Sequence, residues 1–320
     1  MTRRAAHVLL LFLDGVGLGD DDPAINPFAV ARTPALDALA GGRHWLRDAP
    51  RHDNGRAVFV PTDPRLGVPG RPQSASGQAT ILTGRNIPAA IGEHYGPRPN
   101  PAIRALVRAD NLFLRVTQAG GSAALINGYP PRFHEAISSG KRLPSAYQEA
   151  VLGAGLPIFT EVEMYAETAM SPDWTGEGWR NELGYADTPL YDRAEAGAHL
   201  ARLARQRDFT FFSHWMTDVV GHRGPLERGV ALVELFNDVL AGLLDAWDDA
   251  NDLLVITSDH GNLEDLSIRQ HTLNDVPTVA VGAARHDFAA GLRDLTGIAP
   301  GVLRVLGLDS KSSGYVNYRK

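Results

Sequence analysis

Short apolar runs alternate with polar and helix-period segments along most of this 320-residue chain. Each run is bounded by polar or turn-forming residues, as strands buried on both faces of a sheet commonly are. Four such runs stand out, and a fifth follows nearer the C-terminus. The predicted strands cover residues 7–13, 122–126, 209–212, 253–257 and 276–281.

Helical signals separate these strands. Thr33 and Asn100 each precede a proline, and a capping residue followed by proline at the first helical position is a common helix start. Asn111 is a third candidate cap. Apolar residues recur at every third or fourth position over residues 230–247 and 300–306, which predicts two amphipathic helices. The alternation of strands and helices indicates an α/β protein.

The stretch from residue 129 to residue 191 differs from its surroundings. It is rich in Pro, Gly, Trp and Tyr and has little periodicity. We expect it to form a small cap inserted into a core made of residues 1–128 and 192–320. The pattern leaves the oligomeric state unknown.

The first residues resemble a secretion signal, because Arg3 and Arg4 precede an apolar run. The run is too short for such a signal, and no cleavage site of small residues follows it. It ends at Asp14, which suits a buried strand. No stretch approaches the length needed to span a membrane. We therefore expect a cytoplasmic protein that does not bind membranes.

Composition narrows the chemistry. A net charge of -6 gives no reason to expect nucleic acid as a partner. The chain has no cysteine, which excludes disulfides and thiolate metal ligands. A metal site would have to use His and carboxylate side chains.

Acidic and imidazole side chains lie at the ends of the predicted strands: most follow a strand, and His271 lies just before the fifth. In open α/β sheets, ligands bind outside the carboxyl ends of the strands, so these side chains are expected to converge on one crevice. Asp and His together suit borderline divalent cations. The set comprises Asp14, His214, Asp218, His222, Asp259, His260 and His271.

This set is larger than one tetrahedral ion needs, so we infer two metal ions. Two adjacent metals can hold the attacking and leaving oxygens of an in-line displacement at phosphorus. Ser74 is the candidate nucleophile, because it precedes a short helical pattern and would lie at the positive end of the helix dipole. A coordinated metal would lower the pKa of its hydroxyl much further. Ser76 is the alternative nucleophile.

At these residues the sequence resembles the alkaline phosphatase superfamily. It is most similar to the branch of cofactor-independent phosphoglycerate mutases and phosphopentomutases. The order and rough spacing of the motifs agree, and the predicted cap lies outside the resemblance. The matching segments are LDGVG from residue 13, ARTPALD from 31, SASGQATILTGR from 74, DVVGH from 218, SDHGN from 258 and HT from 271.

The resemblance implies an α/β/α sandwich of three layers and a division of the ligands. Ser74 would attack phosphorus and form a phosphoserine, which water or another hydroxyl would then cleave. The two divalent ions would be Mn²⁺ or Zn²⁺, and the similar branch uses manganese. One ion would be held by Asp14, Ser74, Asp259 and His260, and the other by Asp218, His222 and His271.

The chain departs from the mutase pattern at two points. Gln78 stands where that branch usually has histidine, which would alter the surroundings of the metal ligands. The region between Ser74 and Asp218 is too short for the large mutase insert, and the sequence gives no support for retaining an intermediate, which favours hydrolysis. We therefore expect a phosphomonoesterase that acts on a small phosphorylated substrate. A phosphodiesterase or nucleotide pyrophosphatase, a phosphomutase and a non-catalytic scaffold are the alternatives.

Some candidates rest on weaker signals. Arg85 ends the nucleophile segment and could bind phosphate or support the end of the helix. Asn127 and Tyr129 follow a predicted strand and could contact substrate or form a turn. His214 could support the metal site or pack at the end of its strand.

Overall fold

A computed structural model describes residues 4–308 of the chain. Its centre is a seven-stranded sheet with the order β2-β3-β7-β6-β1-β5-β4. β1, β4, β5 and β6 are parallel to one another, whereas β7 runs antiparallel to β6, β3 to β7, and β2 to β3. The strands are β1 (His7–Leu13), β2 (His52–Asp53), β3 (Ala57–Thr62), β4 (Ala123–Leu125), β5 (Phe209–His214), β6 (Asp252–Ser258) and β7 (Val276–Val281).

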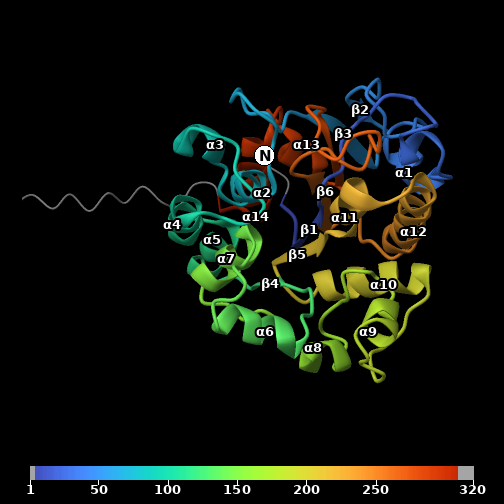
Figure 1. Ribbon diagram of the computed structural model, residues 1–320. Coiled ribbons are helices and arrows are strands. Elements are labelled where there is room, and N and C mark those ends of the chain that lie inside the picture. Colours follow the sequence, from blue (N-terminus) through green and yellow to red (C-terminus); the bar gives the residue numbers. More distant parts are fainter. Residues whose placement is uncertain (1–3, 309–320) are drawn as a thin grey trace, which may run out of the picture.

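Helices cover both faces of the sheet (Figure 1). Shorter 3₁₀ turns lie at Pro27–Ala29 and Leu295–Gly297. The α-helices are α1 (Pro34–Leu39), α2 (Ser74–Thr83), α3 (Ile87–Ile91), α4 (Pro101–Ala109), α5 (Leu112–Gln118), α6 (Pro131–Ser138), α7 (Ala146–Gly153), α8 (Glu161–Tyr165), α9 (Glu177–Asn181), α10 (Arg193–Ala204), α11 (Met216–Arg223), α12 (Leu226–Asp245), α13 (Arg285–Ala289) and α14 (Ile298–Leu306).

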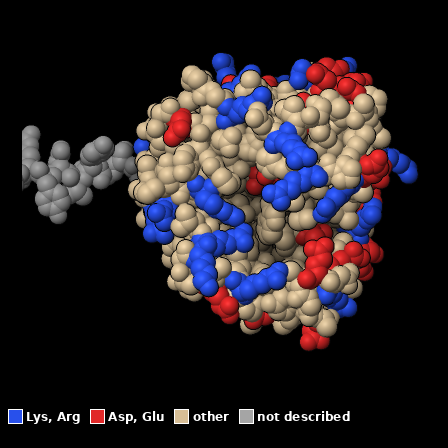
Figure 2. Space-filling model, viewed as in Figure 1, with Lys and Arg blue, Asp and Glu red and all other residues tan. Residues whose placement is uncertain are grey.

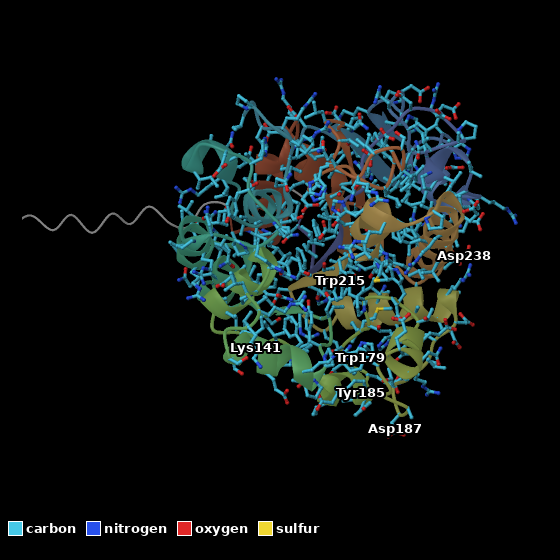
Figure 3. The ribbon with its side chains drawn as sticks, in the orientation of Figure 1. Lys141, Trp179, Tyr185, Asp187, Trp215 and Asp238 are labelled. Atoms are coloured by element: carbon cyan, nitrogen blue, oxygen red, sulfur yellow. The ribbon has the colours of Figure 1, made fainter. Side chains whose placement is uncertain are left out.

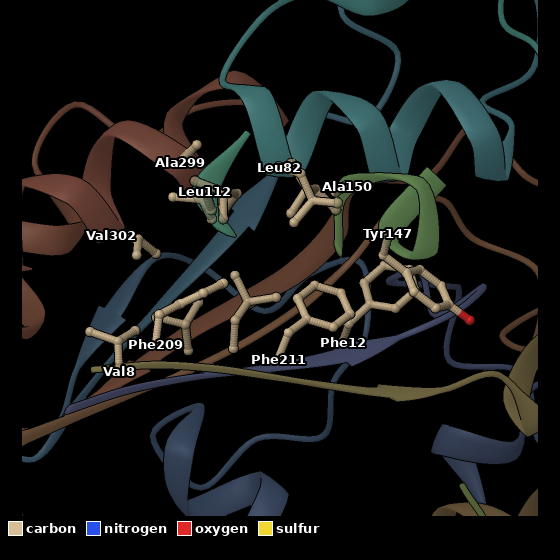
Figure 4. Close-up of a cluster of buried hydrophobic side chains, with 14 of the residues drawn as sticks. Val8, Phe12, Leu82, Leu112, Tyr147, Ala150, Phe209, Phe211, Ala299 and Val302 are labelled. Carbon is tan, nitrogen blue, oxygen red and sulfur yellow. The ribbon is translucent and has the colours of Figure 1, made fainter. Parts of the chain in front are cut away.

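The central strand β1 contributes to two hydrophobic cores. Successive side chains of a strand point to opposite faces, so Val8, Leu10 and Phe12 join one core, while Leu9 and Leu11 join the other. Figure 4 shows the first core, in which Phe12 and Phe211 lie beneath α2, α7 and α14. α10 and α12 pack on the opposite face. The prediction of a three-layer α/β/α fold is confirmed.

Two of the three predicted helix starts have a side-chain capping hydrogen bond. The side chain of Asn100 accepts a hydrogen bond from the N–H of Ile103, and that of Asn111 from the N–H of Leu114. Thr33 stands at the N-cap of α1 but makes no such bond. Its hydroxyl donates instead to the Asp37 carboxylate at 2.8 Å.

The predicted cap, residues 129–191, contributes to more than one part of the molecule. Residues of α7 are fully buried in the first core, against α2 and α4. α6, α8 and α9 lie together beyond the β4 end of the sheet, in the lower part of Figure 1. Met164, Ala169 and Trp179 form a small hydrophobic cluster of their own there. The division into a core and a cap stays a proposal.

None of the helices in the described part of the chain combines the length and the apolarity needed to cross a membrane.

His199 on α10 makes stability sensitive to acid. Only 4% of the residue is exposed, and its ring stacks on Tyr191 with the centroids 4.7 Å apart. Burial, and then the charge of Arg202, lower the pKa of His199 from 6.5 to about 4. The unfolded chain therefore takes up this proton first, so the stability linked to it is present above pH 6.5 and is lost as the pH falls through 4.

We expect this one histidine to lower the free energy of unfolding by about 2–3 kcal/mol between pH 7 and pH 4.5. Urea unfolding at both pH values, with chelator present throughout, measures the loss. Over this pH interval, the loss of stability of a His199→Leu variant should be smaller than that of the wild type by about 2–3 kcal/mol. An equal pH dependence for the two proteins would contradict the expectation.

Candidate metal centre and nucleophile

The carboxyl ends of three parallel strands bring the predicted ligands together. Asp14 directly follows β1, Asp259 directly follows β6, and Asp218 lies on α11 just after β5. The N–H of Asp14 donates to the carbonyl of His214 at 3.0 Å, which ties the end of β1 to the end of β5. The crevice at this edge of the sheet therefore collects side chains from distant parts of the sequence.

One group of side chains surrounds Nε2 of His260. The Ser74 Oγ lies 3.0 Å from it, Asp14 Oδ1 3.4 Å and Asp259 Oδ2 3.6 Å. All four residues are buried. The ligand atoms of the two carboxylates and the imidazole lie within 4.8 Å of one another, close enough to bind one ion.

A second group adjoins the first. The Nε2 atoms of His222 and His271 are 3.3 Å apart, and they lie 3.4 and 3.6 Å from the oxygens of Asp218. His260 connects the two groups, because its ligand atom also lies within 4.8 Å of those of Asp218 and His271.

Hydrogen bonds on the far side of each ring orient this second group. Nδ1 of His222 donates to the carbonyl of Arg269, and Nδ1 of His271 to the carbonyl of Pro72, both at 2.8 Å. In neutral imidazoles this leaves the Nε2 lone pairs facing each other. Such lone pairs repel unless a cation lies between them, and metal-binding histidines are oriented by this kind of bond.

The carboxylates also fit a cation. Burial, and then repulsion from Asp259, raise the pKa of Asp14 well above its usual value, and burial and Asp218 do the same for Asp259. The Gln78 amide is a donor shared by the two carboxylates, at a long 3.4 Å from each. Oxygen and imidazole donors of this kind suit Mn²⁺ and Zn²⁺ alike.

Local structure distinguishes the two candidate nucleophiles. The Ser76 hydroxyl donates to the carbonyl of Gln73 and accepts from the N–H of Tyr95, and the residue is fully buried. Ser74 is the first residue of α2, and its Oγ faces His260. A Cβ on Gly77 would come within 2.8 Å of the Asp259 Cβ, so glycine lets α2 approach the ligands closely. The geometry favours Ser74.

Glu264 was not predicted from the sequence. Its buried carboxylate accepts hydrogen bonds from the N–H groups of Gly17 and Asn262, at 3.0 and 2.7 Å, and from the side chains of Thr272 and Asn274. It therefore connects the loops that carry Asp14, His260 and His271. Its place two residues beyond the SDHGN segment, among apolar and motif residues, is the signal that could have revealed it.

We expect Glu264→Gln to weaken metal binding by roughly 10- to 100-fold, because an amide cannot accept all of these hydrogen bonds. Calorimetric titration with Mn²⁺ and with Zn²⁺ measures the change in metal affinity. Asp265→Asn removes a charge from the neighbouring residue, whose carboxylate bonds only to Ser267, and should leave the affinity nearly unchanged. Equal affinities for both variants would contradict a role for Glu264 in holding the loops.

A cavity of about 880 Å³ opens above the two groups, and we call it the main cavity. Asp14, Ser74 and Asp218 contribute to its wall. Figure 2 shows the hollow, with Lys and Arg on its left and lower sides and Asp and Glu on its right. A smaller cavity of about 440 Å³ lies beside His222 and His271 and also reaches Ser74.

The three predicted substrate contacts have different positions. Tyr129 lines the main cavity. Arg85 lies beyond the far end of α2, about 15 Å along the helix axis from Ser74. The Asn127 side-chain amide donates a hydrogen bond to the carbonyl of Ser213 and accepts one from its N–H, each at 2.8 Å. These bonds extend the pairing of β4 with β5. Arg85 and Asn127 line neither cavity, so the structure gives their predicted contact no support.

His214 packs at the end of its strand. Its Nδ1 bonds to the carbonyl of Pro172 at 2.7 Å, and its ring lies 4.8 Å from that of Trp174. It belongs to neither of the two ligand groups.

Comparison with known proteins shows which proteins this chain resembles. Residues 181–310 match the model of the metalloenzyme superfamily. The 2,3-bisphosphoglycerate-independent phosphoglycerate mutase of Methylobacillus flagellatus is 32% identical over 124 residues, which are 37% of this chain and 23% of the relative. The enzyme of that name from Halobacterium salinarum is 40% identical over 100 residues, or 29% of this chain and 20% of the relative. The chain thus matches about a quarter or less of the length of these relatives.

Solved structures support the fold over nearly the whole chain. The PH0037 protein of Pyrococcus horikoshii gives a TM-score of 0.57 at 17% identity and covers 98% of this chain and 100% of its own. The phosphoglycerate mutase of Leishmania mexicana gives 0.52 at 13% identity, with 97% of each chain covered. The family model, the curated relatives and the motifs support an assignment to the alkaline phosphatase superfamily of metalloenzymes and a similarity to its branch of cofactor-independent phosphoglycerate mutases, while the solved structures show the fold.

Proposed function

We propose that this chain is a metal-dependent phosphomonoesterase that works through a phosphoserine at Ser74. The observation that carries the proposal is the position of the Ser74 Oγ, 3.0 Å from His260 Nε2 and in the wall of both cavities. A nucleophile in that position can reach a phosphoryl group held over the ligand groups.

Two divalent cations, Mn²⁺ or Zn²⁺, would lower the pKa of the Ser74 hydroxyl and neutralise charge on the phosphoryl oxygens when bound. The O and N donors suit both metals, and the family resemblance favours manganese. The residues that would hold them are Asp14, Ser74, Asp259 and His260 for one ion, and Asp218, His222 and His271 for the other.

The residues of the chain then account for the two transfers. The Ser74 hydroxyl releases its proton, and its oxygen bonds to phosphorus as the ester P–O bond breaks. The leaving oxygen takes up a proton, and the alcohol departs into the main cavity. The N-terminal position of Ser74 on α2 directs the positive end of the helix dipole toward the phosphoryl oxygens. Water then attacks phosphorus from the cavity side, the Ser74 O–P bond breaks, and the serine recovers its proton.

The openness of the main cavity favours water as the final acceptor. A mutase has to retain the dephosphorylated molecule until the phosphoryl group returns to it. The main cavity reaches the surface as an open hollow (Figure 2). A phosphomutase is the second candidate function, because the curated relatives are named phosphoglycerate mutases.

Product analysis tests the proposal. The metal-loaded protein is incubated separately with 4-nitrophenyl phosphate, bis(4-nitrophenyl) phosphate and 3-phosphoglycerate, and both inorganic phosphate and 2-phosphoglycerate are quantified. Phosphate release from the monoesters supports a phosphomonoesterase. Faster cleavage of the diester would indicate a phosphodiesterase, and isomerisation without phosphate release would indicate a mutase.

Metal analysis distinguishes an enzyme from a scaffold. We expect the protein to bind two Mn²⁺ or Zn²⁺ ions per chain, to lose its activity in a chelator and to regain it when the metal is restored. A chain that binds neither ion and cleaves no ester would fit the scaffold alternative.

A further inference from the structure

We propose that Arg98 and Arg142 form a binding subsite for a second anionic group, a carboxylate or a phosphate, on the leaving-group side of the substrate. This inference rests on the proposed function, because it concerns the part of the ester that Ser74 would release. Both arginines line the main cavity together with Ser74.

The first argument is that these arginines have no carboxylate partner. Some arginines of the chain pair with acidic residues, as Arg56 does with Asp249 and Arg205 with Asp252. Among residues 4–308, none of the ion pairs includes Arg98 or Arg142. Arg132 also lines this cavity. This wall therefore carries positive charge that the described residues do not neutralise.

The second argument is that the two guanidinium groups repel each other. Burial, and then the like charge of Arg98, lower the pKa of Arg142 from its usual value. The charge of Arg98 also lowers the pKa of Asp14, so Arg98 is near enough to influence both Asp14 and Arg142. An anion bound between two such cations removes the repulsion and gains charge-assisted hydrogen bonds.

The third argument is that aromatic rings hold Arg142 in position. Its guanidinium lies over the Phe133 ring, 5.1 Å from the centroid. Phe133 stacks on Tyr129 at 4.4 Å, and Tyr129 stacks on Trp215 at 6.0 Å with the planes 10° apart. Trp215 comes three residues before Asp218, so the row of rings runs from the metal ligands to Arg142. Figure 3 places Trp215 near the middle of the molecule.

Acidic residues also line the main cavity. They are Asp173, Glu177 and Glu182, in or near α9. Figure 2 shows the two signs separated across the hollow. A substrate with two anionic groups would therefore be held in one orientation, with its ester at Ser74 and its second anion against the arginines.

The size of the main cavity agrees with a leaving group that extends away from phosphorus. Its volume of about 880 Å³ is in the range of pockets that enclose whole metabolites or cofactors. A phosphoryl group and a small alcohol would leave most of this space, and the arginine wall, without a contact.

Matched pairs of esters test the subsite. One pair is 4-carboxyphenyl phosphate and its uncharged counterpart 4-carbamoylphenyl phosphate; a shorter pair is 3-phosphoglycerate and glycerol 3-phosphate. For at least one pair we expect kcat/KM to be about 10- to 100-fold higher for the carboxylate, the usual effect of hydrogen bonds to a charged group. The preference should shrink as ionic strength rises.

In an Arg98→Gln/Arg142→Gln double variant, we expect the ratio of the two kcat/KM values to fall to near one. Arg85→Gln is the control, because it removes one positive charge outside both cavities and should leave the ratio at the wild-type value. Equal kcat/KM within both pairs in the wild type would overturn the proposal, as would an undiminished preference in the double variant.

A binding measurement separates this inference from the proposed function. If no ester is hydrolysed, the proposed function fails, and calorimetry with metal-loaded Ser74→Ala protein still compares the affinities of each carboxylate ester and its uncharged counterpart. Tighter binding of the carboxylate, removed by the double variant but not by Arg85→Gln, supports the subsite. Equal affinities within each pair overturn it.

Discussion

Replacing Ser74 by alanine is expected to lower the rate of monoester hydrolysis by roughly 10⁴-fold or more, because no other hydroxyl takes its place. The Ser76 hydroxyl is bonded to Gln73 and Tyr95 and is buried. Steady-state kinetics measures the loss. Acid quenching during turnover, followed by mass spectrometry of the peptide that contains residues 74 and 76, shows whether a phosphoserine forms and where.

Ser76→Ala is the matched control for this experiment. We expect it to keep most of the activity and to lose about 1 kcal/mol of stability with its two hydrogen bonds. A Ser74→Ala protein that still accumulates a phosphoenzyme would disprove the assignment of the nucleophile. If Ser76→Ala alone abolished phosphorylation, the two serines would have to exchange roles.

Much of the fold could be predicted because buried parallel strands form continuous apolar runs. β1 and β7 were predicted with the bounds that the structure has, and β5 and β6 to within a residue or two. β3 was missed. Its sequence, AVFVPT, contains Pro61, which normally argues against a strand inside a sheet. Pro61 is tolerated because it faces another proline, Pro277 of β7, at a position where neither residue can donate an N–H.

Burial within the predicted cap could not be predicted in the same way. α7 carries Gln148 and Glu149, which suggest an exposed helix, yet both are almost fully buried. Glu149 forms an ion pair with Arg108 of α4, at 2.6 Å, and Gln148 completes a capping box with Ser145. The partner that allows a carboxylate to be buried lies 41 residues away, and the local pattern does not contain it.

The gathering of the candidate metal ligands could be predicted, because most of them follow parallel strands that bring distant residues together, while His271 lies shortly before β7. The substrate contacts could not, since they depend on the direction of single side chains. Asn127 follows β4 as expected, but its amide is taken up by the backbone of Ser213. Arg98 and Arg142 lie in loops without periodicity, and only the fold places them over Ser74.

Asp14→Asn is expected to change activity and metal-free stability in opposite directions. Asp14 is buried beside Asp259, and the two carboxylates repel each other in the absence of a cation. An asparagine keeps the shape, removes one negative charge and can donate a hydrogen bond to Asp259. In chelator, we expect the variant to be more stable than the wild type by about 1–3 kcal/mol, because an uncompensated buried charge has been removed.

With metal present, the order should reverse. An ion at one hundred times its Kd stabilises the wild type by about 2.7 kcal/mol, and the variant should lose most of this gain together with roughly 10³-fold or more of its activity. Urea unfolding with chelator and with Mn²⁺ or Zn²⁺ measures both states, and Asp21→Asn at an exposed position should follow the wild type in each. A variant that is less stable than the wild type in chelator but equally stabilised by metal would show that Asp14 supports the fold and does not bind the ion. A carboxylate that only supports the fold cannot destabilise the metal-free protein and stabilise the metal-loaded one. Opposite effects of Asp14→Asn on stability in chelator and with metal would therefore identify Asp14 as a ligand of the ion.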